Sequence, residues 1–453
     1  MLKVAKFGGS SVASASQFRK VKDIILSDPS RRLVVVSAAG KRDSKDHKIT
    51  DLLYLCHAHL TYGVSCDEIF DKISSRFIEI RDGLGLSFRI EDELDALRGR
   101  LNKDFSVDEL VSRGEYLTSR LMAEYLGYSF LDASKCIFMD YDGRFIPEKI
   151  AKAVKEVLNE EKGVVIPGFY GVLPSGKIKV MSRGGSDITG SLVAAACNAD
   201  LYENWTDVSG ILMADPRIVD NPSPISEITF AELRELAYMG ASVLHEDSVA
   251  PVKEIGIPLN IRNTNDPSHP GTMIVDKAGG NEFDQDRFIT GISGKRNFII
   301  LTVSKRINGS NETLRDVLEI LDRHKVHAEH ISMGIDQFAL VLSQTSIGDS
   351  LYEIIGDIRA KCSPDDVSVQ DNIALVAAVG RKMIFRPGIS GKLFNALGKE
   401  GINIRTIAQG SDELAIIVGV DNSQFETTIR VLYHMQQGQV RIQFVLFCHI
   451  REG

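Results

Sequence analysis

Short apolar runs alternate with amphipathic stretches along the first part of the chain. The runs rich in β-branched residues predict strands over 4–7, 33–37, 163–167 and 200–205. Apolar residues recur at helical spacing over 16–26, 109–126 and 147–160, and Pro147 suits a first helical turn. Buried strands that alternate with helices are typical of a mostly parallel sheet covered on both faces. We therefore predict an α/β fold for this part.

The pattern changes in a polar, glycine-containing stretch from Lys277 to Asp286. Beyond it, the spacing predicts helices over 314–324 and 389–399, and strands over 298–303, 338–342, 374–379 and 414–420. The predicted domains are 1–285, 290–365 and 370–450.

The C-terminal part carries an internal repeat with a spacing of 76 residues. The matching pairs are Leu321 and Leu397, Ile331 and Ile407, Gly334 and Gly410, Asp336 and Asp412, and Ala339 and Ala415. This repeat predicts two copies of a βαββαβ-like unit, arranged as two small sheets side by side with paired clefts. Such an arrangement suits binding and not chemistry.

Length and charge narrow the function. A chain of 453 residues suggests about three domains. A formal charge of −8 without a dense Lys/Arg stretch argues against nucleic-acid binding. Six scattered cysteines predict reduced thiols and no zinc site. With no leader at the N-terminus and no apolar run long enough to span a membrane, we expect a cytoplasmic protein.

The first chemical signal is Lys6-Phe7-Gly8-Gly9-Ser10, between a predicted strand and a predicted helix. Glycines let backbone N–H groups approach an anion, the helix N-terminus adds positive potential, and lysine supplies a charge for phosphate. The spacing is not that of a P-loop NTPase. For such a pair taken alone, a tight turn that merely needs glycine is the favoured explanation, and the context must decide.

A second glycine pair follows in Ser182-Arg183-Gly184-Gly185-Ser186-Asp187, before a predicted helix over 188–196. Arg183 suits bidentate binding of a carboxylate or phosphate, whereas Ser186 and Asp187 can cap the helix or orient a metal-bound phosphate. A plain helix cap is the alternative. Two such loops are harder to explain by turns alone.

The third signal runs from Trp205-Thr206-Asp207 to Asp215-Pro216-Arg217. Asp207 ends an apolar strand, where open α/β sheets bind their ligands, and Arg217 can reach phosphate. An Asx-turn at Asp207 and a surface turn at Asp215 are the alternative.

Together with Arg113-Gly114-Glu115, these motifs resemble the aspartate kinase family in their order, and the repeated tail resembles the family's two ACT domains. The resemblance implies an amino-acid-kinase (carbamate-kinase-like) three-layer αβα sandwich with a mostly parallel sheet, plus two C-terminal ferredoxin-like ACT domains. It also implies ATP-dependent formation of 4-phospho-L-aspartate with Mg²⁺, the first step toward lysine, threonine, methionine and isoleucine. No general base is expected, because a carboxylate nucleophile needs none.

The resemblance also assigns residues. The implied catalytic residues are Lys6, Gly8, Gly9 and Asp187. Aspartate would be bound by Thr50, Glu115, Phe169, Arg183 and Ser186. ATP would be bound by Lys6, Gly9, Ser10, Thr206, Asp207, Leu212, Arg217 and Ser242. At two of these positions the chain departs from the family, which usually has tyrosine at Leu212 and lysine at Ser242.

The tail carries the expected regulation. Met333, Gly334 and Asp336 lie in a loop that resembles the effector loop of family ACT domains, and the implied effector is lysine or threonine. Pairing of such domains implies a homodimer or homotetramer. His324, His327 and His330 lie close together in sequence, but we expect surface histidines there and not a metal site.

Two other functions remain open. Related amino-acid kinases phosphorylate glutamate, acetylglutamate, carbamate or UMP on the same fold, although Arg113-Gly114-Glu115 and the double tail favour aspartate. Leu212 and Ser242 are also compatible with a decayed kinase kept as a regulatory subunit, whereas intact Lys6, Arg183, Asp187 and Asp207 favour catalysis. We expect a monofunctional enzyme without a fused homoserine dehydrogenase.

Overall fold

The computed structural model describes residues 1–182, 184–241, 244, 246–277, 288–305, 310–381, 383, 387–410, 412 and 414–436. The chain divides into two compact units. The first comprises Met1–Ile211, Pro224–Leu233 and Ser242–Gly280, and the second comprises Leu212–Ser223, Arg234–Ala241 and Asn281–Gly453. Arg183, Ser242 and most of the expected boundary over 277–286 lie outside the described residues, and the domain limits stay a prediction.

A large sheet organises the first unit. Within the described residues it has eight strands in the order β10-β12-β11-β7-β1-β2-β4-β3. Its strands are β1 (Lys3–Phe7), β2 (Leu33–Val36), β3 (Ser129–Phe130), β4 (Val164–Pro167), β7 (Leu201–Thr206), β10 (Glu227–Thr229), β11 (Leu259–Asn263) and β12 (Thr272–Val275). The neighbours β11, β7, β1, β2, β4 and β3 run parallel, whereas β12 pairs antiparallel with β11 and β10 pairs parallel with β12. The four strands predicted from apolar runs are all present, with ends shifted by one residue at most.

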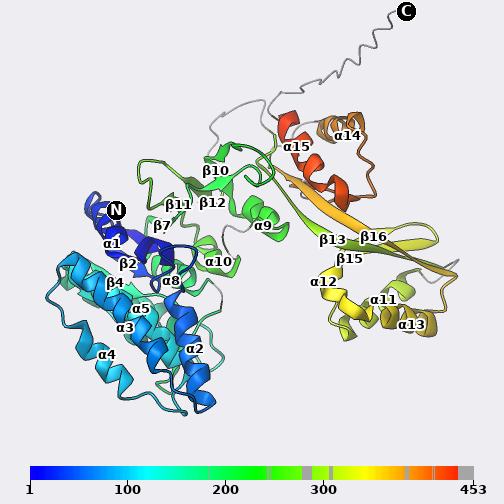
Figure 1. The fold of residues 1–453 in the computed structure, drawn as a ribbon. Helices are drawn as coiled ribbons and strands as arrows, with labels where there is room; N and C mark the ends of the chain where they lie inside the picture. Colours follow the sequence, from blue (N-terminus) through cyan, green and yellow to red (C-terminus); the bar gives the residue numbers. More distant parts are fainter. Residues whose placement is uncertain are drawn as a thin grey trace, which may run out of the picture. The chain divides into compact units, whose positions relative to one another are not determined.

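Helices cover both faces of this sheet (Figure 1). They are η1 (Gly9–Val12), α1 (Ala15–Leu26), α2 (Ile49–Thr61), α3 (Asp67–Leu84), α4 (Ile90–Arg98), α5 (Val107–Leu126), α6 (Ala133–Cys136), α7 (Pro147–Glu160), α8 (Gly185–Cys197) and α10 (Glu246–Glu254). The core formed by α1 to α5 includes Ala5, Phe7, Val34 and Val36 of the sheet. Helix α8 packs on the opposite face of β1, β2 and β7, beside α7 and α10. The three-layer sandwich is thus confirmed.

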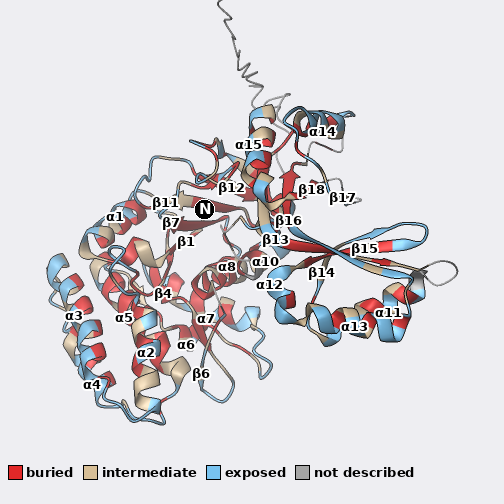
Figure 2. Cartoon of the chain, turned by 45° about the vertical axis from the view of Figure 1, so that its right-hand side comes forward, coloured by how far each residue is buried: buried red, intermediate tan, exposed pale blue. Residues whose placement is uncertain are grey.

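The sheet is buried on both faces because its helices enclose it (Figure 2). All four residues of β2 and all four of β4 are buried. Continuous apolar strands of this kind are stable only between two helix layers. Because both faces of these strands are buried, the strands are continuous apolar runs in the sequence, and these runs predicted them well.

A charged network is buried within this apolar setting. Arg31 donates to both carboxylate oxygens of Glu203, at 2.6 and 3.1 Å, and Trp205 Nε1 donates to Glu203 Oε2 at 3.0 Å. Arg262 lies over the Trp205 ring, 4.6 Å from its centroid. Glu203 is 1% exposed. Satisfying a buried carboxylate in this way ties β7 to the segment after α1.

The second unit contains a separate antiparallel sheet. Within the described residues it has six strands in the order β14-β15-β13-β16-β18-β17. Its elements are β13 (Gly291–Ser304), α11 (Ser310–Arg323), β14 (Ala328–Met333), β15 (Gln337–Ser343), α12 (Gln344–Ile347), η2 (Gly348–Ser350), α13 (Leu351–Cys362), β16 (Asp366–Val379), α14 (Ile389–Lys399), β17 (Thr406–Gln409), β18 (Ala415–Asp421), η3 (Asn422–Gln424) and α15 (Phe425–Gln436). These elements recur in the order that the repeat predicted.

The expectation of two small sheets was wrong, because the two repeats share one sheet. Strand β13 pairs with β16 along its length, with Gly291 opposite Val379 at one end and Ser304 opposite Asp366 at the other. The part of β13 before the first repeat thus lies beside the first strand of the second repeat. Each half of the sheet includes part of a strand from the other half, so the two repeats form one continuous sheet.

Smaller elements complete the description. The hairpin β5 (Tyr170–Val172) and β6 (Ile178–Val180) precedes α8, and β8 (Ile211–Leu212) pairs with β9 (Pro224–Ile225). Helix α9 (Phe230–Tyr238) begins in the first unit and ends in the second. Of the helices described, none has the length and apolarity needed to cross a membrane. Five cysteines in the described part of the chain are buried free thiols, in agreement with the expectation of reduced cysteines.

Replacing Arg31 by Ala should destabilise the first unit. Glu203 would then keep the hydrogen bond from Trp205 Nε1, with Lys3 at 3.7 Å and Arg262 at 3.9 Å as its nearest described cations. Removing one partner of a buried ion pair costs roughly 3 kcal/mol. The chain's one tryptophan, Trp205, lies in the network, so its fluorescence during urea unfolding reports this region. The midpoint should fall clearly in R31A and stay within error in R89A, whose pair with Asp92 is exposed. Equal midpoints for R31A and the wild type would contradict the assigned role of the network.

Candidate functional site

The predicted site residues gather at one edge of the large sheet. Strands β7, β1, β2 and β4 are consecutive and parallel, so their carboxyl ends meet at the same edge. The loops that leave these ends are tied by backbone hydrogen bonds from Gly8 N to Trp205 O, at 3.0 Å, and from Ser37 N to Phe7 O, at 3.1 Å. Ligands of open α/β sheets bind at this edge.

Gly9 is required because two of these loops nearly touch. A Cβ atom on Gly9 would lie 2.9 Å from the carbonyl oxygen of Ala38, and one on Gly40 would lie 2.6 Å from the Gly9 carbonyl carbon. Gly40 N donates to Gly9 O at 2.9 Å. The glycine of the first motif therefore serves close backbone approach, which leaves no room for a side chain.

A buried cluster of three polar side chains lies behind this loop. Lys6 Nζ is 2.5 Å from Asp187 Oδ1 and 3.4 Å from Asn204 Oδ1, and Asn204 Nδ2 donates to Asp187 Oδ1 at 2.8 Å. Lys6 and Asn204 are 6% and 4% exposed. The structure thus brings together Lys6 and Asp187, which were both predicted as catalytic. The cation of this cluster is the Lys6 ammonium group, near the carboxyl end of β1.

Asn204 was missed by the sequence analysis. It lies opposite Lys6 in the parallel register of β1 and β7, so both side chains leave the same face of the sheet. A polar residue inside an otherwise apolar strand was the available signal, but the pairing of β1 with β7 joins residues that are 198 positions apart. Sequence periodicity does not reveal such pairings.

Asp187 lies in the first turn of α8, which begins after Gly184 in a left-handed conformation with φ 79°. Tyr202 donates its hydroxyl to the Asp187 carbonyl at 3.1 Å. Ser186 packs against Gly168, where a Cβ atom would lie 2.6 Å from the Ser186 Cβ. The helix start is thus fixed against β7 and the loop after β4, with Asp187 of its first turn beside Lys6.

Phe169 occupies this loop in a strained conformation. Its φ of 77° is rare for a residue with a side chain. Thr189 Oγ1 accepts from its N–H at 3.0 Å, and its carbonyl accepts from Met181 N at 2.7 Å. Packing of the ring at Gly185 brings Phe169 to the start of α8. Strain that is held in place by specific contacts is often found at functional sites.

Glu115, in the middle of α5, is a buried carboxyl group. Burial raises its pKa to about 8, partly offset by the Ala38 backbone N–H. Oε2 has no hydrogen-bond partner. Gly114 allows the close approach, since a Cβ atom there would be 3.0 Å from the Ala38 Cβ. A buried carboxyl oxygen without a partner can accept a hydrogen bond from a bound ligand, and an ammonium group could donate that bond.

Thr50 lies in the first turn of α2, whose start is fixed by Ile49 N donating to Ala39 O at 3.2 Å. The same loop is held to α5 by Ala39 N donating to Thr118 Oγ1, at 3.2 Å. Helices α2 and α5 therefore meet the 37–40 loop from one side. Thr50 and Glu115 thus lie on two helices that pack against each other and are both bonded to this loop.

The residues predicted to bind nucleotide are divided between the units. Thr206 and Asp207 follow β7 in the first unit, with Thr206 Oγ1 donating to Asp207 Oδ1 at 3.2 Å. Ser10 lies in η1 after Gly9. Leu212 and Arg217 belong to the second unit, where Arg217 is 88% exposed and pairs with Asp215 at 2.6 Å. This guanidinium lowers the pKa of Asp215. The contacts of Arg183 and Ser242 are outside the described residues.

The described side chains give no indication of a permanently bound metal ion. Among the residues described, no three His, Cys, Asp or Glu side chains are grouped as ligands. His324 Nε2 bonds Asp357 Oδ2 at 3.1 Å, which links α11 to α13. The predicted absence of a histidine metal site stays a prediction. Mg²⁺ commonly binds through substrate phosphates and one or two carboxylates, and Asp187 and Asp207 are of the right type for that.

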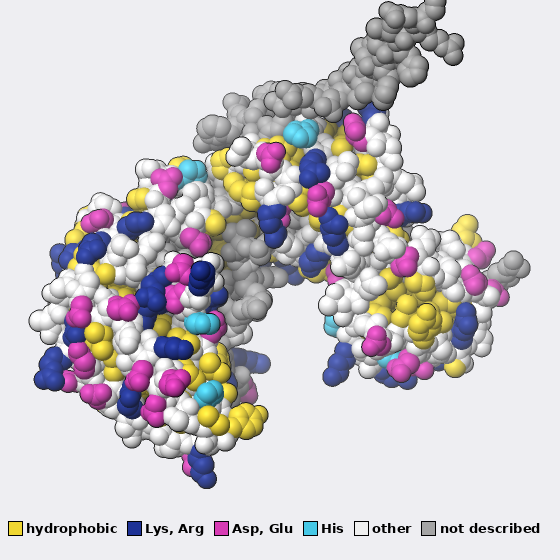
Figure 3. All heavy atoms as spheres, in the orientation of Figure 1, with side chains coloured by type: hydrophobic (Ala, Val, Ile, Leu, Met, Phe, Trp, Pro, Cys, Tyr) yellow, Lys and Arg dark blue, Asp and Glu magenta, His cyan; other side chains and the backbone are white. Residues whose placement is uncertain are grey.

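The predicted effector residues form an exposed turn in the second unit. Gly334 N donates to Gln337 O at 2.7 Å, and Lys305 N donates to Asp336 O at 2.8 Å. Met333, at the end of β14, is 48% exposed. Figure 3 shows basic and acidic side chains interspersed over the face in view, without one sign dominating.

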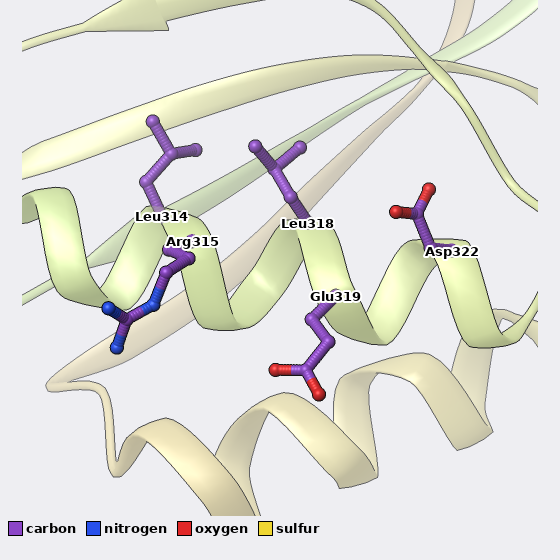
Figure 4. Close-up of a pocket in the computed structure, with 5 residues that line it drawn as sticks. All are labelled: Leu314, Arg315, Leu318, Glu319 and Asp322. Atoms are coloured by element: carbon purple, nitrogen blue, oxygen red, sulfur yellow. The ribbon is translucent and has the colours of Figure 1, made fainter.

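A hollow of about 520 Å³ lies on α11 and is lined by Leu314, Arg315, Leu318, Glu319 and Asp322 (Figure 4). Its lining contains none of the predicted catalytic, substrate or effector residues. Leu314 and Leu318 are partly buried against the apolar core under α11, and the hollow lacks the convergent polar groups of a catalytic centre.

Known proteins resemble the chain over nearly its whole length. The sequence profile of the amino acid kinase family matches residues 1–263, and that of the ACT domain matches residues 376–436. Aspartokinase 3 of Bacillus subtilis is 35% identical, over 95% of this chain and 98% of its own. The lysine-sensitive aspartokinase 3 of Escherichia coli is 31% identical, over 95% and 98%.

Solved structures agree. The aspartate kinase of Clostridium acetobutylicum is 46% identical with a TM-score of 0.88, and the match covers 96% of this chain and 99% of the other. Escherichia coli aspartokinase III in complex with aspartate and ADP is 29% identical with a TM-score of 0.74, covering 97% and 100%.

Replacing Glu115 by Gln should stabilise the protein in alkali. Because the pKa of Glu115 is raised in the folded state, its stabilising contribution is present below its ordinary pKa and is lost as the pH rises through about 8. At about pH 9 the wild type must hold a buried carboxylate, which costs on the order of a few kcal/mol. E115Q should therefore melt at a higher temperature than the wild type near pH 9, with little difference near pH 5.

The control is E124Q, which changes an exposed carboxyl group on the same helix. Its melting temperature should follow that of the wild type at both pH values. If E115Q showed no alkaline advantage over E124Q, burial of the Glu115 charge would not be the cause.

Proposed function

The chain belongs to the aspartokinases of the amino acid kinase family, and from this premise we propose how its residues phosphorylate aspartate. An aspartokinase transfers a phosphoryl group from ATP to the side-chain carboxylate of L-aspartate, which gives 4-phospho-L-aspartate and ADP. This step opens the biosynthesis of lysine, threonine, methionine and isoleucine and is under allosteric control.

The observation that carries the proposed mechanism is the buried Lys6 beside the glycine loop. Charge builds up on the oxygens of a phosphoryl group in transfer, and a preorganised cation stabilises it best in a site from which water is excluded. Asp187 and Asn204 hold the ammonium group in place. We assign Lys6 to the phosphoryl group, with the Gly9 and Ser10 backbone N–H groups as donors. Gly8, whose N–H is bonded to Trp205 O, would leave space in front of the ammonium group, since a Cβ atom there would lie 3.5 Å from Lys6 Nζ.

Aspartate binding is assigned to charges of opposite sign. Glu115 would accept from the α-amino group, whose ammonium supplies the partner that Oε2 lacks. Arg183 would bind a carboxylate, and Thr50, Ser186 and Phe169 would complete the pocket. A neutral Glu115 becomes ionised when the ammonium group arrives, because a nearby positive charge favours the carboxylate form.

ATP binding is assigned to Lys6, Gly9, Ser10, Thr206, Asp207, Leu212, Arg217 and Ser242. Mg²⁺ would enter with the nucleotide, held by its phosphates and by Asp187 or Asp207, and would neutralise phosphate charge. The rival that Leu212 and Ser242 mark a decayed kinase is disfavoured by the intact contact between Lys6 and Asp187. Acetylglutamate and UMP are disfavoured as acceptors, because neither carries the ammonium group that Glu115 suits.

The second unit is assigned to regulation. We propose that lysine, threonine or both bind around Met333, Gly334 and Asp336, since the Escherichia coli relative was solved with lysine and aspartate. Exposed Ile331 and Met333 on β14, the edge strand of the described sheet, and Ile335 in the turn after it form an apolar surface, which supports a homodimer or homotetramer. The hollow on α11 adds apolar surface to the same unit. A cytoplasmic location completes the proposal.

Purified protein with Mg-ATP should release ADP with aspartate and not with glutamate, acetylglutamate or UMP. K6M should reduce kcat by about 10² to 10³, because it removes a charge that acts in the transition state. K152M changes an exposed lysine on α7 and should keep full activity. Repeating the assay with lysine, threonine and both identifies the effector. Absence of turnover with every acceptor from folded protein would favour the regulatory-subunit alternative.

The KM for aspartate should fall as the pH rises through about 8 in the wild type, since the free enzyme then carries the Glu115 carboxylate that the ammonium group needs. In E115Q the KM should be higher and independent of pH over this range. Initial rates at saturating ATP measure both profiles. A pH-dependent KM in E115Q equal to that of the wild type would assign the ammonium contact to another group.

A further inference from the structure

Segment 212–223 carries Leu212 and Arg217 and forms part of the second compact unit. It links β8 to β9, and Met213 N donates to Ser223 O at 2.9 Å across its base. Within it, Ile218 N and Val219 N both donate to Asp215 O, at 2.9 and 3.0 Å, so that Arg217 lies on a compact turn. The conformation of this turn sets where the Arg217 guanidinium can reach.

Two side chains of α15, those of Tyr433 and Arg430, form hydrogen bonds to this segment. Tyr433 Oη accepts from Ser223 N at 2.9 Å and lies 3.2 Å from Ser223 Oγ. Arg430 Nε donates to Ile218 O at 2.8 Å, one residue beyond Arg217. Tyr433 is 6% exposed, so its hydroxyl contact is shielded from water.

Strand β13 fixes the other end of the segment. Ile292 N donates to Met213 O at 2.7 Å. Met213, Ala214 and Val219 are buried, whereas Pro216 and Arg217 are exposed. The segment therefore has a fixed base in the second unit and an exposed tip that presents a charged side chain.

We propose that Tyr433 and Arg430 are positioning residues for nucleotide binding, which act by holding segment 212–223 with Arg217 at its tip. This inference rests on the proposed role of Arg217 in binding ATP. Neither residue touches the nucleotide in this proposal. Because α15 belongs to the second repeat, a shift of α15 alters the conformation of the segment and with it the affinity for ATP, while aspartate binding is unaffected.

The test compares Y433F and R430A with the wild type. Y433F removes the hydroxyl group that makes two contacts and R430A removes one donor, and each loss of a shielded hydrogen bond corresponds to roughly a three- to tenfold change. The KM for ATP should rise by that factor and the KM for aspartate should stay within about twofold. Hydrogen exchange measured by mass spectrometry should be faster in peptides that cover 212–223.

Two matched controls separate this role from general damage to α15. E426Q removes an ion pair of Arg430 at 3.1 Å but leaves its bond to Ile218 O, and Y352F changes an 84% exposed tyrosine on α13. Both should match the wild type in the KM for ATP and in exchange over 212–223. Wild-type values of both quantities in Y433F and R430A, or equal rises in the KM for ATP and for aspartate, would overturn the proposal. Faster exchange with an unchanged KM for ATP would overturn it too.

R217A tests the premise on its own. If the KM for ATP rises in R217A, Arg217 binds nucleotide, and the outcome of Y433F and R430A then decides the positioning role alone. If R217A leaves the KM for ATP unchanged, the role assigned to Arg217 is wrong, and an effect of Y433F and R430A on this KM would act through other residues of the segment.

Discussion

The ion pair between Lys6 and Asp187 is the contact on which the rest of the site depends. An ammonium group that is almost fully buried is tolerated only with a charged partner and further hydrogen bonds. Asp187 and Asn204 provide them, and they come from the start of α8 and from β7. The pair therefore fixes the helix start relative to two parallel strands, and it keeps a cation at a strand end without water. A phosphoryl group that enters this edge meets the charge already in place, so little reorganisation is needed.

Close backbone approach is the second constraint, and it follows from the first. To bring a substrate to a buried cation, the loops after β1 and β2 must come together with no side chains between them. Gly9 and Gly40 meet this requirement, because a Cβ atom on either would collide with the other loop. Glu115 reaches the same region because Gly114, which has no side chain, lets α5 approach Ala38 closely. Gly9, Gly40 and Gly114 thus serve one purpose, which is to let these loops and α5 approach one another closely.

The sequence predicted those parts of the molecule that depend on local patterns. Strands such as 164–167 are apolar throughout and short, helices such as 147–160 have regular spacing, and the repeat placed the elements of the second unit in order. It did not predict how β13 and β16 pair, because strand partners are chosen by contacts between residues distant in the chain. Glu203, Arg31 and Asn204 were missed for the same reason. Each is polar in an apolar setting, and its partner can be identified only once the sheet order is known.

The functional motifs were predicted by resemblance more than by physics, and the structure shows where physics adds to it. Family motifs identify Thr206, Asp207 and Arg217 together, although the chain divides them between two compact units. Arg217 lies on a turn whose backbone contacts are made by Arg430 and Tyr433, more than two hundred residues later. A sequence motif identifies side chains that occur together, but it does not show which other residues fix their positions. Because Arg217 and the residues of α15 that contact its turn belong to the same unit as the C-terminal repeats, nucleotide binding and regulation need not be separate properties of the chain.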